Sequence, residues 1–169
     1  METLALVAGL CAVFFFLLSF QFPNRKAIIA CNITSRALYI AQYLLLFAFE
    51  GAAMDLAAVP SSVMAARKHT PFVEKHRLAI LAAVNVFVVG VGALVSQSWL
   101  SWVPVVGVLL ETNALWMTRE THIRILSLGA LPFWLFYNLS CGAYGAALGN
   151  VLAMGSIVTA MVRYDVVRK

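Results

Sequence analysis

Long apolar stretches separated by short polar segments make up the whole chain. A helix that crosses a bilayer needs about 20 mostly apolar residues, and in lipid its backbone groups are satisfied within the helix itself. The pattern therefore predicts an all-α membrane protein. The third of its apolar segments is short and contains Pro60, which predicts a kink or local unwinding because proline removes a backbone donor. Seven segments come close to the required length and are predicted as transmembrane helices: 3–21, 27–49, 51–66, 78–97, 101–118, 123–139 and 143–163.

Basic residues occur at every second gap between these segments. The first, third and fifth gaps and the C-terminal tail carry Lys and Arg, whereas the second, fourth and sixth gaps carry none. Because loops that stay in the cytoplasm are enriched in Lys and Arg, we predict that the N-terminus is outside and the C-terminus is cytoplasmic. An odd number of spans requires the same arrangement. The residues concerned are Arg25, Lys26, Arg67, Lys68, Lys75, Arg77, Arg119, Arg124, Arg163, Arg168 and Lys169.

The two ends of the chain have matching segment lengths. When residues 8–69 are shifted by 95 positions onto residues 103–164, helices and loops align without a gap. This predicts two three-helix repeats, residues 1–69 and residues 101–169, joined by a cytoplasmic loop and a linker helix within 70–100. Because one helix separates the repeats, both point the same way across the membrane. The predicted plan is therefore a 3-1-3 arrangement of parallel repeats, related by an axis along the membrane normal.

Composition supports lipid as the solvent of this chain. The chain is 63% hydrophobic and 11% charged, whereas soluble proteins average about 25% charged residues. The formal net charge of +5 fits loops beside an anionic membrane face. No nucleic-acid partner is expected, because no base-stacking aromatic residues are interleaved with the basic ones. The cysteines lack metal-ligand spacing and no catalytic motif occurs, so we predict no enzyme activity, no metal and no cofactor.

Two charged residues fall well inside predicted membrane helices. A charge at the centre of a membrane helix costs about 2.5–3.5 kcal/mol on insertion scales, so Arg36 and Glu111 need an explanation. Both are expected near the middle of the membrane and are candidates to pair across the repeat interface. One interpretation is a structural ion pair, or an Arg36 whose guanidinium reaches the cytoplasmic headgroups. The alternative is a role in binding a substrate or handling a proton.

The 95-residue shift also places candidate binding residues on equivalent positions. Asp55 falls on Asn150, and Tyr39 falls on Trp134. Two polar side chains related in this way can converge on a central cavity and hydrogen-bond a polar solute near the midplane. The alternative is that Asp55 is solvated at the outer interface and Asn150 bonds a neighbouring helix. The aromatic pair is likewise either a stacking site for a ring-shaped solute or a pair of packing residues.

Small residues predict where helices approach closely. Gly145, Gly149 and Ala153 recur every four residues, and Gly90 lies on the linker helix. Such positions allow close packing of another helix, either within the chain or in a homo-oligomer. Proline residues within or at the ends of the repeat helices are candidates for the bends about which the repeats tilt; these include Pro60, Pro104 and Pro132.

Several short motifs connect the chain with known membrane proteins. In the second half they are Pro104-Val105-Val106-Gly107, Ala114-Leu115, and Trp134, Asn138, Gly142 and Gly145 within 133–145; in the first half they are Asn24-Arg25 and 42–45. With these residues the chain resembles bacterial inner-membrane proteins of the YgjV type. In its three-one-three plan it also resembles the SWEET (MtN3-type) sugar facilitators and the PQ-loop proteins. The resemblance implies the bacterial inner membrane as its location.

These observations favour one function and leave another open. The leading interpretation is a facilitator or transporter of a small polar solute, neutral or cationic, in which one repeat tilts against the other around a polar cavity. The alternative is a non-transporting receptor or complex subunit with the same fold. Apart from the bilayer and the solute, a second copy of the chain is a possible partner.

Overall fold

A computed structural model describes residues 2–19 and 25–163 of the chain, and the fold of this part is helical throughout. Each of the seven predicted segments corresponds to one long helix, although the observed bounds differ by up to a few residues. A short helix and one 3-10 turn in the loops were not predicted. The elements are α1 (Glu2–Ser19), α2 (Arg25–Leu45), α3 (Phe49–Ala66), α4 (Pro71–Lys75), α5 (Arg77–Val95), η1 (Trp99–Ser101), α6 (Trp102–Trp116), α7 (Glu120–Ser140) and α8 (Tyr144–Met161).

Length and composition identify the strongest candidates for membrane spans. Three helices in the described residues are long and apolar enough to cross a bilayer: Arg77–Val95, Thr121–Ser140 and Tyr144–Met161. The apolar helix Glu2–Leu18 is slightly shorter. Helix α6 has 15 residues and is also below this length. The described residues therefore form an all-helical fold with three candidate membrane spans, whereas the crossing of the bilayer by all seven long helices stays a prediction.

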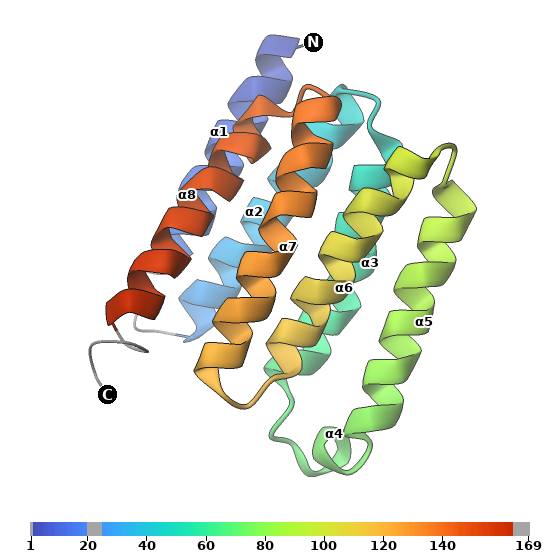
Figure 1. The fold of residues 1–169 in the computed structure, drawn as a ribbon, viewed down its shortest axis with the longest axis vertical. Helices are drawn as coiled ribbons and strands as arrows, with labels where there is room; N and C mark the ends of the chain where they lie inside the picture. Colours follow the sequence, from blue (N-terminus) through green and yellow to red (C-terminus); the bar gives the residue numbers. More distant parts are fainter. Residues whose placement is uncertain (1, 20–24, 164–169) are drawn as a thin grey trace.

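The long helices form two layers with α5 at one edge (Figure 1). Helices α1, α2 and α3 make up one layer, and α6, α7 and α8 make up the other. Neighbours within each layer pack against one another, while α1 packs on α8 and α3 on α6 between the layers. Helix α5 packs on α3 and α6 and leaves most of its apolar surface exposed. The middle helices α2 and α7 therefore face each other across the centre of the bundle.

The two layers correspond closely in backbone detail. Helix α7 begins and ends 95 residues after α2, and α8 begins and ends 95 residues after α3. The turns between these helices also match, because Phe47 and Gly142 both have positive φ angles, 56° and 73°. Ala48 N donates to Tyr43 O and, 95 residues later, Ala143 N donates to Asn138 O. The spacing of 95 residues seen in the sequence alignment therefore also separates the ends of these helices, although their predicted bounds differ from the observed ones by up to a few residues.

The basic loops lie at one end of the bundle. Arg67, Lys68 and Lys75 lie around the connection from α3 to α5, and Arg119 lies between α6 and α7. In Figure 1 these connections are at the bottom, together with the end of α8. Helix α1 begins at the opposite end, so the described chain starts and finishes at different ends of the bundle.

Proline and glycine residues behave differently from some of the predictions. Helix α3 continues through Pro60 and α7 continues through Pro132, so the local unwinding expected at Pro60 does not occur. Pro104 lies in the first turn of α6, where the missing N–H has no intrahelical partner to lose.

The expectation of close packing at Gly90 is not met within the described chain, because a Cβ there would meet nothing within 4 Å. On α5 the close contact is at Gly92, which packs against Val105.

Candidate functional site

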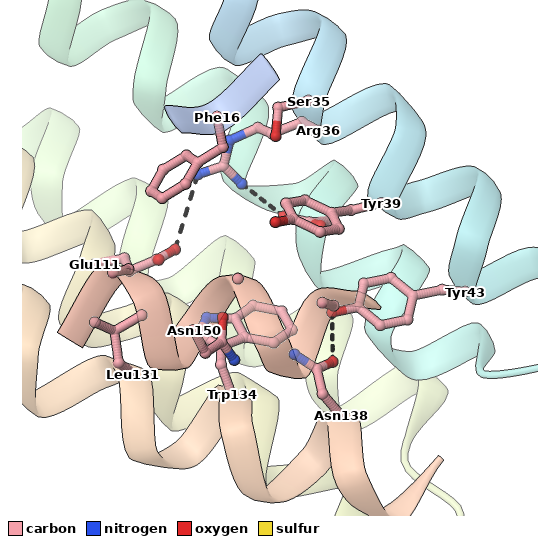
Figure 2. A pocket seen from close by; sticks show the side chains of 14 residues that line it. Phe16, Ser35, Arg36, Tyr39, Tyr43, Glu111, Leu131, Trp134, Asn138 and Asn150 are labelled. Atoms are coloured by element: carbon pink, nitrogen blue, oxygen red, sulfur yellow. Dashed lines mark hydrogen bonds and ion pairs between the residues drawn. The ribbon is translucent and has the colours of Figure 1, made fainter. Parts of the chain in front are cut away.

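A cavity of about 90 Å³ lies between the two layers, near the middle of the bundle. All six helices of the two layers contribute lining residues, and α5 contributes none. Figure 2 shows these side chains pointing toward one another from opposite layers. Since one water molecule occupies about 30 Å³ in the liquid, the cavity has room for a few waters or a small solute. The residues that line it are Phe16, Ser35, Arg36, Tyr39, Tyr43, Asp55, Glu111, Leu131, Trp134, Asn138, Ala146, Gly149, Asn150 and Ala153.

Most of the lining residues form pairs at a spacing of 95. Each pair contributes one residue from each layer, so the cavity lies where equivalent helices of the two layers meet. Three of these pairs combine a charged side chain with a neutral one. The pairs are Phe16 and Glu111, Arg36 and Leu131, Tyr39 and Trp134, Tyr43 and Asn138, and Asp55 and Asn150.

The charged side chains form one network in the cavity (Figure 2). Arg36 Nη1 lies 2.7 Å from Asp55 Oδ1 and donates a hydrogen bond to it. Arg36 Nη2 lies 3.8 Å from Glu111 Oε2. The first contact joins α2 to α3 within one layer, and the second joins α2 to α6 in the other layer. Trp134 lines the same cavity as these charged side chains. Arg36 therefore serves two carboxylates, one tightly and one loosely.

Exposure differs among the three charged side chains. The side chain of Asp55 is 9% exposed, that of Arg36 is 23% exposed and that of Glu111 is 32% exposed. Asp55 is thus buried and paired, which rules out the solvated position at the outer interface that the sequence had left open. Arg36 reaches Asp55 instead of extending to the end of the bundle. Leaving one partner of such a pair unmatched costs about 3–5 kcal/mol, so Arg36 and Asp55 constrain each other.

The end of the cavity away from the basic loops is closed by aromatic side chains. Tyr43 Oη donates to Asn138 Oδ1 at 2.7 Å, between α2 and α7. The rings of Tyr43 and Trp134 stack with centroids 6.3 Å apart, so Trp134 stacks on Tyr43 and not on its equivalent Tyr39. Next to them Tyr137 Oη accepts a hydrogen bond from Gly51 N at 2.8 Å. Tyr43 and Asn138 are 2% and 1% exposed, so the contact between them is buried.

Small residues on α8 bring the cavity wall close to α1. A Cβ on Gly145 would lie 2.8 Å from Gly9 Cα, and one on Gly149 would lie 2.7 Å from Tyr39 Oη. Ala153 is buried on the same stripe. Next to Gly149, Asn150 Nδ2 is buried and has no hydrogen-bond partner in the described residues. The stripe predicted from sequence is therefore a packing surface inside the chain, and it leaves one amide available to a solute.

The structure brings together every binding residue that the sequence analysis selected. Asp55, Asn150, Tyr39 and Trp134 line the cavity, as do Arg36 and Glu111, the two charges predicted to lie within the membrane. The tight partner of Arg36 is Asp55, whereas only its looser contact with Glu111 was expected. Phe16 and Tyr43, which also line the cavity, were not predicted, and Asn138 was named only within a sequence motif. The signal was present, because the 95-residue shift also pairs Tyr43 with Asn138 and Phe16 with Glu111.

The site has no feature of a metal centre in the part of the chain that the structure describes. No group of three or more His, Cys, Asp or Glu side chains there is placed to hold a metal ion. The arrangement of one guanidinium, two carboxylates, two amides and four aromatic side chains suits the binding of a small polar molecule.

Comparisons with known proteins agree with the membrane character of the fold. No curated protein and no solved structure is similar to the chain. The family model Imp-YgjV, described as bacterial inner membrane protein, matches residues 3–168. This match covers nearly the whole sequence, so the chain belongs to the Imp-YgjV family of bacterial inner membrane proteins.

Proposed function

We propose that this protein moves a small polar solute across the bacterial inner membrane by alternating access. In this proposal all seven long helices span the membrane, with α1–α3 and α6–α8 as parallel repeats and α5 as the linker. The N-terminus is outside, and the basic loops and the C-terminus are cytoplasmic, as the positive-inside rule predicts. The observation that carries the proposal is the cavity lined by equivalent residues from both layers.

The cost of the charged residues supports a functional site at this position. Ionisable side chains inside membrane proteins are expensive, and they commonly mark the paths of substrates or ions. Here three of them converge on one cavity, and Asn150 adds an amide nitrogen without a partner. A core with a purely structural role does not need charged side chains, because well-packed apolar residues of similar volume stabilise a fold as well or better.

The contacts between the layers suggest how access alternates. At one end the layers are joined by the buried bond between Tyr43 and Asn138. Toward the basic loops the corresponding contact is the longer one between Arg36 and Glu111, both of which are partly exposed. We therefore assign the described conformation to a state that faces the cytoplasm. Tilting of one repeat against the other would separate Tyr43 from Asn138 and close the opposite end.

Cysteine labelling from each face of the membrane tests this proposal. Cys11, Cys31 and Cys141 are first replaced by Ser, and single variants Asn150→Cys and Trp134→Cys are then made. Each is treated with a membrane-impermeant thiol reagent in right-side-out and inside-out vesicles. We expect labelling of both variants from the cytoplasmic face, and slower labelling from the outer face as the minor state is visited. The matched control is Val86→Cys at the middle of α5, whose side chain is 73% exposed toward the surroundings of the bundle, and which lipid should protect from both faces.

Two outcomes decide between transport and the alternative of a receptor or subunit. Labelling of the cavity variants from both faces, with the α5 control unlabelled, supports a path through the protein. Labelling from neither face, in variants that keep the thermal stability of the parent, overturns the proposal. Once a solute is known, Asp55→Ala and Asn150→Ala should lower its flux in proteoliposomes, and unchanged flux would remove both residues from the site.

A further inference from the structure

The cavity holds one more acidic than basic side chain. Its formally charged lining residues are Arg36, Asp55 and Glu111, so their sum is one negative charge. Arg36 is closer to one carboxylate than to the other, at 2.7 Å from Asp55 and 3.8 Å from Glu111. Asp55 is thus neutralised by a charge-assisted hydrogen bond, which is among the stronger polar contacts. Glu111 keeps an incompletely compensated carboxylate and is the most exposed of the three.

The walls beside Glu111 suit an organic cation. Tyr39, Tyr43 and Trp134 line the same cavity, and the faces of such rings attract ammonium and guanidinium groups within about 6 Å. Trp134 and Glu111 line the same cavity, so aromatic rings and an anion share one small space. Asn150 supplies the amide without a partner. A cation at Glu111 would therefore meet a counter-ion, aromatic faces and a hydrogen-bonding group.

Inorganic divalent ions fit these surroundings poorly. Ca²⁺ takes about six to eight oxygen ligands, and Mg²⁺ is bound through carboxylates and several retained waters. One of the two carboxylates here is occupied by Arg36, and aromatic carbon covers much of the wall. The volume of about 90 Å³ also limits the size of an organic guest.

We infer that the solute is a small organic monocation of the ammonium or guanidinium class, with Glu111 as its counter-ion and Trp134 and Tyr39 as its aromatic walls. This inference rests on the proposed function and names its substrate class. Arg36 remains on Asp55 when the solute binds, and the solute takes over the looser contact that Arg36 makes with Glu111. Arg36 is accordingly a positioning residue, because it neutralises Asp55 and thereby leaves a single free carboxylate.

Guanidinium and urea provide a matched pair of probes, since both are small and planar but only guanidinium is charged. The full-length protein is reconstituted in liposomes with an inside-negative potential, and uptake of each radiolabelled probe is measured against protein-free liposomes. We expect guanidinium uptake to exceed urea uptake about ten-fold or more, because the incompletely compensated carboxylate of Glu111 attracts only the charged probe. Glu111→Gln should lower guanidinium uptake by a similar factor. Glu50→Gln is the matched control, because Glu50 lies in the first turn of α3, outside the cavity lining, and accepts a hydrogen bond from Ser101.

A second readout separates failure of this inference from failure of the proposed function. Guanidinium should slow thiol labelling of the Asn150→Cys variant, and urea at the same concentration should not. If the variant is labelled but guanidinium neither protects it nor enters the liposomes, the solute class is wrong while the access path stands. Equal uptake of both probes, or full guanidinium uptake by a folded Glu111→Gln variant, also overturns the cation assignment. Absence of both labelling and uptake overturns the proposed function as well.

Discussion

The two layers of the bundle share a backbone but differ in the side chains that they present to the cavity. Helices α2 and α3 have the same bounds as α7 and α8 at a spacing of 95 residues, and the turns between them agree in φ and in hydrogen bonding. At the cavity, however, Arg36 corresponds to Leu131 and Asp55 to Asn150. The backbone is thus nearly symmetric, whereas the charge is concentrated in one layer together with Glu111 of the other.

We relate the shared backbone to the proposed movement of the two layers, and the differing side chains to the choice of solute. In the proposed transport cycle, two layers with equivalent backbones can close the cavity at either end with similar helix packing. The side chains of a solute site are under no such constraint, since a small asymmetric molecule contacts each layer differently. A charge that appears in only one layer is therefore where specificity is expected, and substitutions toward the equivalent residue test that idea directly.

The largest effect is expected when Arg36 is replaced by its neutral counterpart. Arg36→Leu leaves Asp55 and Glu111 without their cation, and breaking a buried pair costs about 3–5 kcal/mol. Because the Arg36 side chain is 23% exposed, we expect the lower end of this range and a clear fall in the thermal unfolding midpoint in detergent. The double variant Arg36→Leu with Asp55→Asn reproduces the pair found at Leu131 and Asn150, and should recover most of the loss. A single variant as stable as the parent would contradict the ion-pair network.

A smaller loss is expected where α8 meets α1 through glycine. Gly145→Ala places a Cβ 2.8 Å from Gly9 Cα, and backbone atoms of both helices then have to move apart. Overpacking of this kind costs about 1–3 kcal/mol, measurable as a lower unfolding midpoint. The control on the same helix is Gly155→Ala, where nothing lies within 4 Å and alanine favours the helix by about 1 kcal/mol. Equal effects of the two substitutions would show that α1 and α8 are not in close contact.

The closed end of the cavity can be loosened by removing one oxygen atom. Tyr43→Phe deletes the donor to Asn138 Oδ1 and leaves a buried acceptor without that partner, which costs about 1–3 kcal/mol. We expect about 1 kcal/mol, since a water that enters can replace the bond. Labelling of the Trp134→Cys variant from the outer face should also become faster. Tyr144→Phe is the control, because the Tyr144 side chain is exposed. If Tyr43→Phe matched this control in both measurements, the bond between Tyr43 and Asn138 would not contribute to closing this end of the cavity.

The helices could be predicted from the sequence because apolar length is a local property, and seven long helices are found where apolar segments were predicted. The ungapped alignment at 95 residues also indicated the spacing between helix ends and placed Asp55 and Asn150 at positions that line one cavity. The short helix α4 was missed, because five polar and apolar residues in a loop have no distinctive period. The continuity of α3 at Pro60 was also missed, since packing against α5 and α6 decides it.

Side-chain partners were harder to predict than positions. Depth along the helices indicated that Arg36 and Glu111 lie near each other, but the choice of Asp55 as the tight partner depends on how α2 and α3 rotate about their own axes. Gly90 and Gly92 differ by two positions on α5, and the one that faces α6 cannot be read from composition. Tyr43 carries no charge and looks like a packing residue until its equivalent Asn138 is placed opposite to it.

The smallest expected effect concerns the turn that the two layers share. Gly142 and Phe47 occupy equivalent positions with positive φ, 73° and 56°, and residues other than glycine are strained there by about 1–2 kcal/mol. Gly142→Ala should therefore lower the free energy of unfolding by about 1 kcal/mol, although a Cβ there would meet no neighbour. Phe47→Gly relieves the same backbone strain, but glycine gives the unfolded chain more conformational entropy, which lowers stability by about 0.5–1 kcal/mol. We therefore expect the free energy of unfolding to rise slightly or to stay unchanged. Thermal unfolding of both variants checks the sign of each change in stability. A loss of stability in Phe47→Gly as large as that in Gly142→Ala would contradict this expectation. It would mean that the exposed Phe47 ring stabilises its turn through its contact with Phe49, and that the two turns differ in energy despite their shared geometry.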